Sequence, residues 1–495
     1  MKSLRSRSSL RKLALVCVLA LVAARPLSAT HGRGRNEAPA LMARLDSIMA
    51  RAIRRGVAPG AALAIGHADD EPEIRTYGRI DWAAGSAAVT DRTLFDLASV
   101  TKVVATTPAA MLLVQQGRLD LDQTVASYLG WWPNTGDMGR ITVRQLLLHT
   151  SGLPAGNDLW RVPGDRDARI RHLAEEPLIA HPGAVTLYSD LGMILLGAVV
   201  ESIAGERLDT FVQASLFQPL ALPDTRYLPL DPGDGVPVPL DRIAPTEWAG
   251  RRGHLQGVVD DANAYALAGV AGHAGLFSSI VDLARFARLI LSATEGEDTD
   301  VLNAAVIRSF AADRPDGRRA LGWDGAGSSG WGKYFSAVSF GHSGYTGTSI
   351  WIDPERDIYV VLLTNRVDPS SANQKHLVLR HEISEAVRDH APVRMALATP
   401  GANEADVFAA EVAAARTIFL APVESWKRAT ARYRASHADR RHHVNKASGG
   451  RVRVAPARGR RPASHASSGK HSRTGRSDRS ASGHRDVRSY GGKRT

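Results

Sequence analysis

The chain has 495 residues, of which 44% are hydrophobic, so it can form one large domain or two to three average ones. Its net charge of +12 is concentrated at the ends: residues 427–495 contain 20 Lys and Arg against three Asp, and the first 25 residues contain six basic residues and no acidic one. The part between the ends is therefore acidic overall, and the basic balance does not indicate a globular domain that binds nucleic acid.

The N-terminal segment has the order of a secretory signal peptide. Basic residues precede an apolar run from Leu13 to Ala24, which is too short for an ordinary membrane span, and the small residues Ser28 and Ala29 follow. We expect residues 1–29 to be a signal peptide and the protein to be exported, periplasmic or secreted. The single cysteine, Cys17, then leaves with this segment, which excludes disulfides, cysteine nucleophiles and thiolate metal sites in the mature chain.

The first half of the region that follows begins with a helix and two strands and then becomes mainly helical. The helix at 93–117 contains Pro108, which should kink or divide it because proline lacks an N–H and clashes with the preceding turn. In chain order, we expect a helix at 37–56, strands at 59–66 and 73–81, helices at 93–117, 142–150 and 188–205, and irregular structure at 219–257.

The second half returns to strands. A helix at 278–293 opens with a capping box from Ser279 to Asp282. Residues 340–367 read as two strands joined by a "DPERD" turn, an antiparallel hairpin, and 373–391 as an amphipathic helix. Strands from both ends of the region predict an α+β fold in which an antiparallel sheet carries a helical insertion at about 105–275.

The C-terminal part is expected to lie outside this domain. We predict a domain at 38–397, a helical extension at 398–436 and a disordered basic tail at 437–495, because the tail lacks the apolar surface needed to offset chain entropy. The tail is either a solvated extension or a contact for an anionic cell-wall or membrane surface. Export makes nucleic acid the least favoured partner, and the oligomeric state is not predicted.

Several common catalytic motifs are absent from the sequence. "GHSGYTG" lacks a G-x-S-x-G elbow because Tyr345 occupies the place of the second glycine. "HEISE" at His381 ends in Glu385 and so is no H-E-x-x-H zinc motif. No glycine loop for phosphate or dinucleotide stands out.

The stretch "LFDLASVTKVV" contains a candidate nucleophile and base, Ser99 and Lys102. Residues at i and i+3 share one helix face, so the two side chains are neighbours if a helix begins near Ser99. A serine hydroxyl needs a base beside it, and a lysine in apolar surroundings can serve because burial lowers its pKa. Taken alone the pattern is weak, since Ser99 could equally be an N-cap.

Two later elements strengthen this interpretation. Tyr188 in "LYSD" is either a core tyrosine before a helix cap or a phenol that transfers protons to and from Ser99. His342 in "GHSG" is either a partly buried strand histidine or part of a site where the flanking glycines let a ligand backbone approach the strand edge.

In this order and spacing, "SVTK", "YSD" and "HSG" resemble the penicillin-recognising serine hydrolases, whose pattern is S-x-x-K, Y-x-N or Y-S-x, then K-T-G or H-x-G. That superfamily includes class C β-lactamases, D-alanyl-D-alanine carboxypeptidases and related serine esterases. The surrounding stretches "QQGRLDLDQTV", "LLLHTSGLPAG" and "VAGHAGLFSS" are also similar, and the resemblance covers roughly 38–391. It implies a β-lactamase/transpeptidase-like fold: a five-stranded antiparallel sheet with flanking helices, an all-helical subdomain, and the active site between them.

The resemblance also implies roles for individual residues. Ser99 would be the acylated nucleophile, Lys102 its base and Tyr188 the proton shuttle. His342 would orient substrate, and the oxyanion hole would be formed by the backbone N–H groups of Ser99 and Tyr345. Substrate-binding positions are thus Asp190, His342, Gly344 and Tyr345. No metal or organic cofactor is implied.

Two positions depart from the family pattern. Asp190 stands where many members have asparagine, and its charge could disfavour an anionic substrate or pair with Lys102 or His342. His342 replaces a lysine, which removes a permanent charge and argues against an efficient β-lactamase. Both departures affect the substrate assignment rather than the acyl-enzyme mechanism.

The sequence therefore predicts an exported serine hydrolase that acts on an amide or ester: a D-alanyl-D-alanine-type peptide, a β-lactam or a small ester. The alternatives are an esterase without a wall substrate and a non-catalytic protein that binds the cell wall through a cleft of this type.

The basic tail gives a first testable prediction. Truncation before His437 should weaken binding to isolated cell-wall sacculi, and added salt should weaken binding of the full chain, because screening reduces contacts between exposed charges. Co-sedimentation with sacculi measures both effects. Unchanged binding after truncation would remove the electrostatic role of the tail.

Overall fold

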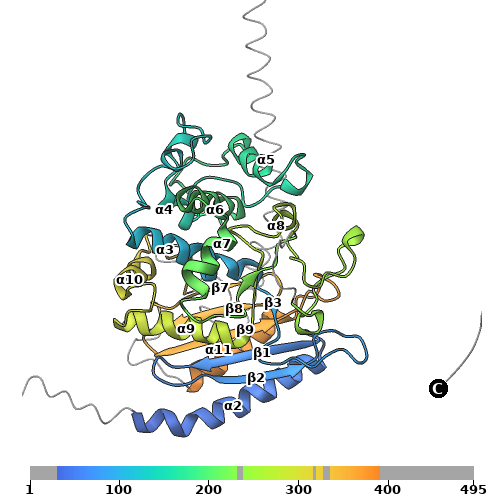
Figure 1. Ribbon diagram of the computed structural model, residues 1–495. Helices are drawn as coiled ribbons and strands as arrows, with labels where there is room; N and C mark the ends of the chain where they lie inside the picture. The colour runs from blue at the N-terminus through green and yellow to red at the C-terminus, as the bar shows by residue number, and fades with distance from the viewer. Residues whose placement is uncertain (1–30, 231–237, 316–318, 327–334, 391–495) are drawn as a thin grey trace, which may run out of the picture. The chain divides into compact units, whose positions relative to one another are not determined.

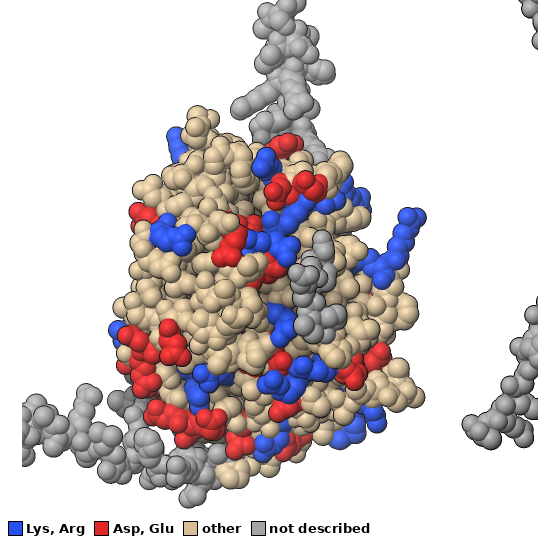
Figure 2. All heavy atoms as spheres, in the orientation of Figure 1, with Lys and Arg blue, Asp and Glu red and all other residues tan. Residues whose placement is uncertain are grey.

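The computed structural model describes residues 31–230, 238–315, 319–326 and 335–390 (Figure 1). The predicted signal peptide (1–29), helical extension (398–436) and basic tail (437–495) lie outside the described residues, as does the end of the predicted domain. On the face drawn in Figure 2, basic and acidic side chains are interspersed.

The main sheet is antiparallel throughout, as predicted, and its strand order is β2-β1-β9-β8-β7-β6. It has six strands where five were expected, because the two-residue strand β6 pairs with β7 at one edge; so short a strand leaves no periodic pattern in the sequence. The α+β class is confirmed. The strands are β1 (Gly60–Gly66), β2 (Glu73–Gly78), β6 (Asp324–Gly325), β7 (Phe340–Ser343), β8 (Ser349–Asp353) and β9 (Ile358–Thr364).

Helices cover both faces of this sheet (Figure 1). On β1, Leu63 and Ile65 belong to the apolar cluster with α2 (His31–Arg54) and α11 (His376–His390), whereas Ala62 and Ala64 belong to the cluster on the other face, with α9 (Ile280–Glu295). This alternation follows from the two-residue period of a strand, and burial on both faces explains why β1 and β9 are apolar along their whole length.

A mainly helical region packs beyond α9, on the side of the sheet away from α2 (Figure 1). Its central helix is α6 (Asp190–Ala204), which is capped by the Ser189 hydroxyl at its start and by Gly205, with φ of 80°, at its end. The other helices are α3 (Thr107–Gln115), α4 (Val143–Leu147), α5 (Arg166–Arg171), α7 (Leu208–Val212), α8 (Ala262–Ala266) and α10 (Ala304–Ala312). A small sheet joins β3 (Phe95–Asp96), β5 (Leu276–Ser278) and β4 (Arg226–Tyr227).

The predicted helix at 93–117 is divided. After β3 come a 3-10 turn (Ala98–Val100), a π-helical turn (Lys102–Thr106) and then α3, with Pro108 in the first turn of α3, directly after the π-helical turn. The stretch from Ala98 to Gln115 is long and apolar enough to cross a membrane, but 83% of it is buried inside the protein. Its apolar character therefore belongs to the core, and this core segment carries Ser99 and Lys102.

The packing beneath the sheet gives a stability prediction. Trp351 on β8 is fully buried, and Trp351→Ala should lower the free energy of unfolding by about 3–5 kcal/mol because it leaves a cavity. Urea unfolding followed by circular dichroism measures the change. The control is Trp160→Ala, at a side chain with 47% exposure, which should change stability by less than about 0.5 kcal/mol; equal losses in both variants would contradict the assigned core.

Candidate active site

Ser99 lies at the centre of the 3-10 turn that leaves β3. The preceding residue, Ala98, has a φ of 46°, a conformation that an L-residue adopts only when its surroundings hold it there. The Asp96 carboxylate accepts the Ala98 N–H at 2.8 Å, and the Leu276 carbonyl accepts the Leu97 N–H at 2.9 Å. The turn that presents the Ser99 hydroxyl is thus fixed on its N-terminal side.

Lys102 is fully buried, and its ammonium group makes two hydrogen bonds and one ion pair. Nζ lies 3.0 Å from Ser99 Oγ, 2.9 Å from the His273 carbonyl oxygen and 2.8 Å from Asp190 Oδ1. These three contacts use all the N–H groups of a protonated lysine. Burial lowers the pKa of Lys102, and the neighbouring Asp190 carboxylate partly opposes that shift.

Tyr188 lies on the other side of the serine, and its hydroxyl donates to Ser99 Oγ at 2.8 Å. The Lys102 ammonium is 5.0 Å from the centre of the Tyr188 ring. Burial, reinforced by the Asp190 charge, raises the pKa of Tyr188 well above its usual value, so the phenol is protonated at neutral pH. The predicted set of Ser99, Lys102 and Tyr188 therefore lies in one hydrogen-bonded group.

Two histidines hold the Tyr188 ring. His149 packs on it with ring centres 4.7 Å apart, and the centre of the His342 ring is 5.9 Å away. Burial lowers the pKa of His149 well below its usual value and that of His342 to about 4, so both rings are neutral at pH 7. His342 is only 2% exposed and is placed behind Tyr188, so a direct contact between His342 and a substrate stays a prediction.

Gly344, two residues after His342, lies where a side chain would collide with neighbouring atoms. A Cβ on Gly344 would lie 2.1 Å from Thr348 Oγ1 and 2.5 Å from the Leu97 carbonyl oxygen. Thr348 Oγ1 itself donates to that carbonyl at 2.9 Å, so the turn after β7 and the turn of Ser99 are in direct contact. This contact places the backbone of Tyr345 on the same cleft wall as Ser99.

These groups open into a cleft of about 380 Å³. Its wall carries Ser99, Tyr188, Asp190 and Tyr345 from the predicted site, and its charged residues are mainly acidic. Besides Asp190 these are Asp158, Glu247, Asp260 and Asp261, against one basic residue, Arg252.

The structure adds residues that the sequence pattern did not assign to the site. Asp261 Oδ1 lies 2.9 Å from His273 Nε2, and although burial opposes it, the histidine lowers the pKa of Asp261 to about 2. This pair fixes the segment whose carbonyl holds Lys102. For His149 and His273, the stretches "HTSGLP" and "GHAGLF" were sequence signals that could have pointed to the site. Asp261 lies in no such motif.

Known proteins resemble this chain in sequence and in fold. The sequence model of the beta-lactamase family matches residues 45–384. An N-acetylmuramyl-L-alanine amidase of Bacillus subtilis (strain 168) is 34% identical over 359 residues, which cover 65% of this chain and 80% of the relative. A putative D-alanyl-D-alanine carboxypeptidase of Escherichia coli (strain K12) is 34% identical over 307 residues, which cover 56% and 70%. The crystal structure of SurE with D-Leu superposes with a TM-score of 0.55 at 26% identity, covering 73% of this chain and 79% of that one.

The contact between Lys102 and Asp190 predicts a change in pH dependence. In Asp190→Asn the opposing charge is lost, so the pKa of Lys102 falls further and a larger fraction is the neutral amine at a given pH. The acid limb of Ser99 labelling by a fluorophosphonate should therefore move to lower pH, by about one to three units.

The matched control is Asp158→Asn, because Asp158 lies on the same cleft wall and its carboxylate is 3.5 Å from Arg161. That variant should keep the wild-type profile. An unchanged profile in Asp190→Asn would show that this carboxylate does not set the protonation of Lys102.

Proposed function

The chain belongs to the beta-lactamase family, within the penicillin-recognising serine hydrolases, and we propose that it opens an amide or ester carbonyl through an acyl-enzyme formed on Ser99. The observation that most directly supports this is the position of Ser99 Oγ, 3.0 Å from Lys102 Nζ and 2.8 Å from the Tyr188 hydroxyl. A serine held by two proton-transfer groups has the arrangement that an activated nucleophile requires.

In the proposed acylation step, the neutral amine of Lys102 takes the proton of the Ser99 hydroxyl while Oγ attacks the carbonyl carbon. The backbone N–H groups of Ser99 and Tyr345 stabilise the oxyanion. When the intermediate collapses, Tyr188 gives its proton to the leaving amine or alcohol and is reprotonated by Lys102. Water then attacks the acyl-enzyme along the same proton route, which restores Ser99.

The favoured substrate is a peptide amide of the bacterial cell wall, of the D-alanyl-D-alanine type. Relatives named as an amidase and a putative carboxypeptidase support this class. The neutral state of His342 supports slow turnover of β-lactams, because no permanent positive charge is supplied at the position where many β-lactamases have lysine. The N-terminal segment supports export to the periplasm or beyond, where such a substrate is found.

Intact-mass spectrometry of the wild-type protein and Ser99→Ala tests the proposal. The probes are penicillin, a D-alanyl-D-alanine peptide and p-nitrophenyl acetate. We expect an acyl adduct or turnover in the wild type, and a loss of more than about 10³-fold in Ser99→Ala because the nucleophile is removed.

Ser127→Ala is the matched control, because Ser127 is exposed and does not line the cleft. It should retain full labelling and turnover. An acyl adduct or an activity that survives Ser99→Ala would contradict the mechanism. A wild-type protein that reacts with none of the probes would favour a binding role instead.

A further inference from the structure

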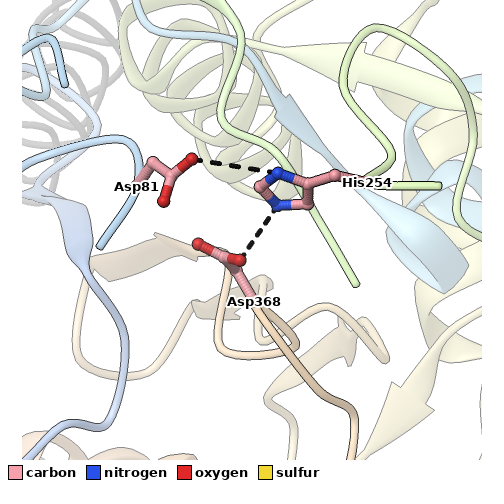
Figure 3. A group of neighbouring side chains, drawn as sticks. All are labelled: Asp81, His254 and Asp368. Carbon is pink, nitrogen blue, oxygen red and sulfur yellow. Dashed lines mark hydrogen bonds and ion pairs between the residues drawn. The ribbon is translucent and has the colours of Figure 1, made fainter. Parts of the chain in front are cut away.

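A second cluster of polar side chains lies outside the cleft, where three distant segments meet. Asp81 follows β2, Asp368 follows β9, and His254 comes from the irregular segment between them (Figure 3). The two carboxylates bracket the imidazole: His254 Nε2 is 3.0 Å from Asp368 Oδ1, and Nδ1 is 3.9 Å from Asp81 Oδ2. One ligand atom from each residue lies within 4.8 Å of the others.

The contact with His254 uses only one of the two carboxylate oxygens of Asp368. The residue is 1% exposed, and its second oxygen, Oδ2, is buried without a hydrogen-bond partner among the described residues. In Figure 3 the carboxylate oxygen that is not bonded to His254 is directed toward the side of Asp81. A buried carboxylate with an unpaired oxygen, close to a second carboxylate, is costly unless a positive charge is shared between them.

The surroundings give an ion access and hold the ligands in place. The cluster lines an open pocket of about 640 Å³ together with Trp82 and Trp248. The Trp248 ring stacks on His254 with ring centres 4.9 Å apart and planes 7° from parallel. The Trp82 indole N–H donates to the Asp368 carbonyl at 2.9 Å, so both tryptophans fix the orientation of the cluster.

We propose that Asp81, His254 and Asp368 form a binding site for a divalent metal ion, with Zn²⁺ the best match. One imidazole nitrogen and two carboxylate oxygens are ligands that zinc accepts, and two carboxylates balance its charge. A neutral imidazole offers one ring nitrogen with a free lone pair, and this nitrogen is the zinc ligand. The open pocket beside the three side chains leaves room for a water molecule as a fourth ligand.

The site has a structural consequence for the cleft. Glu247 and Arg252 line the cleft and belong to the same segment as Trp248 and His254. A metal ion at this site would tie that segment to the ends of β2 and β9. The ion would therefore brace one wall of the cleft without taking part in the chemistry at Ser99.

Isothermal titration of the full-length, chelator-treated protein with Zn²⁺ tests the site. We expect the wild type to bind one equivalent more than His254→Ala or Asp368→Asn. Any Zn²⁺ bound by the histidines of the tail is common to all variants, so only the difference reports on the cluster. Saturating Zn²⁺ should also raise the Tm of the wild type by about 2–5 °C and leave both variants unchanged.

His181→Ala is the matched control, because His181 Nδ1 lies 2.5 Å from one carboxylate, that of Asp137, and the side chain is exposed. It should bind as many equivalents as the wild type. Asp81→Asn, at a less buried ligand, covers the case in which Asp368→Asn fails to fold. Equal stoichiometry and equal Tm shifts in the wild type and these cluster variants would overturn the proposal.

Discussion

The candidate active site depends on one buried ammonium group. Lys102 has no contact with solvent, and its Nζ joins the Ser99 hydroxyl, the His273 carbonyl and the Asp190 carboxylate. These partners come from the segment after β3, the segment before β5 and the start of α6. Because a buried charge without partners is strongly destabilising, the same contacts that position the serine also join the start of α6 to the segments beside the small sheet of β3 and β5.

A second constraint acts on the opposite side of the serine. Gly344 lets the turn after β7 touch the turn of Ser99, and Thr348 Oγ1 fastens the contact through the Leu97 carbonyl. Arg380 of α11 donates to the carbonyls of both Gly344 and Thr348. The turn between β7 and β8 is thus fixed by α11, a helix on the far face of the sheet. The wall of the cleft at Tyr345 therefore depends on helices from both faces.

Short patterns in the sequence predicted several of the elements that form the site. The spacing of Ser99 and Lys102, the capping residue Ser279, and the hairpin of β8 and β9 depend on neighbours in the chain, and the structure contains them where the sequence indicated. The substrate-binding role of His342 could not be judged in this way, because its burial behind Tyr188 depends on packing between segments more than 150 residues apart. Likewise, Asp368 and His254 are 114 residues apart, and nothing near either one signals the other. The six-stranded sheet shows the same limit, since β6 exists only through its pairing with β7.

The pairing of α2 with α11 on the far face of the sheet has a practical meaning. Arg44 and Arg51 of α2 form ion pairs with Asp389 and Glu382 of α11, so the first and last described helices lie side by side. Leu97 and Val100, which flank Ser99, belong to the apolar cluster on the other face of the sheet. A surface linker attached at an exposed residue of α2 or α11 would leave the other face of the sheet free, which makes this domain suited to oriented immobilisation.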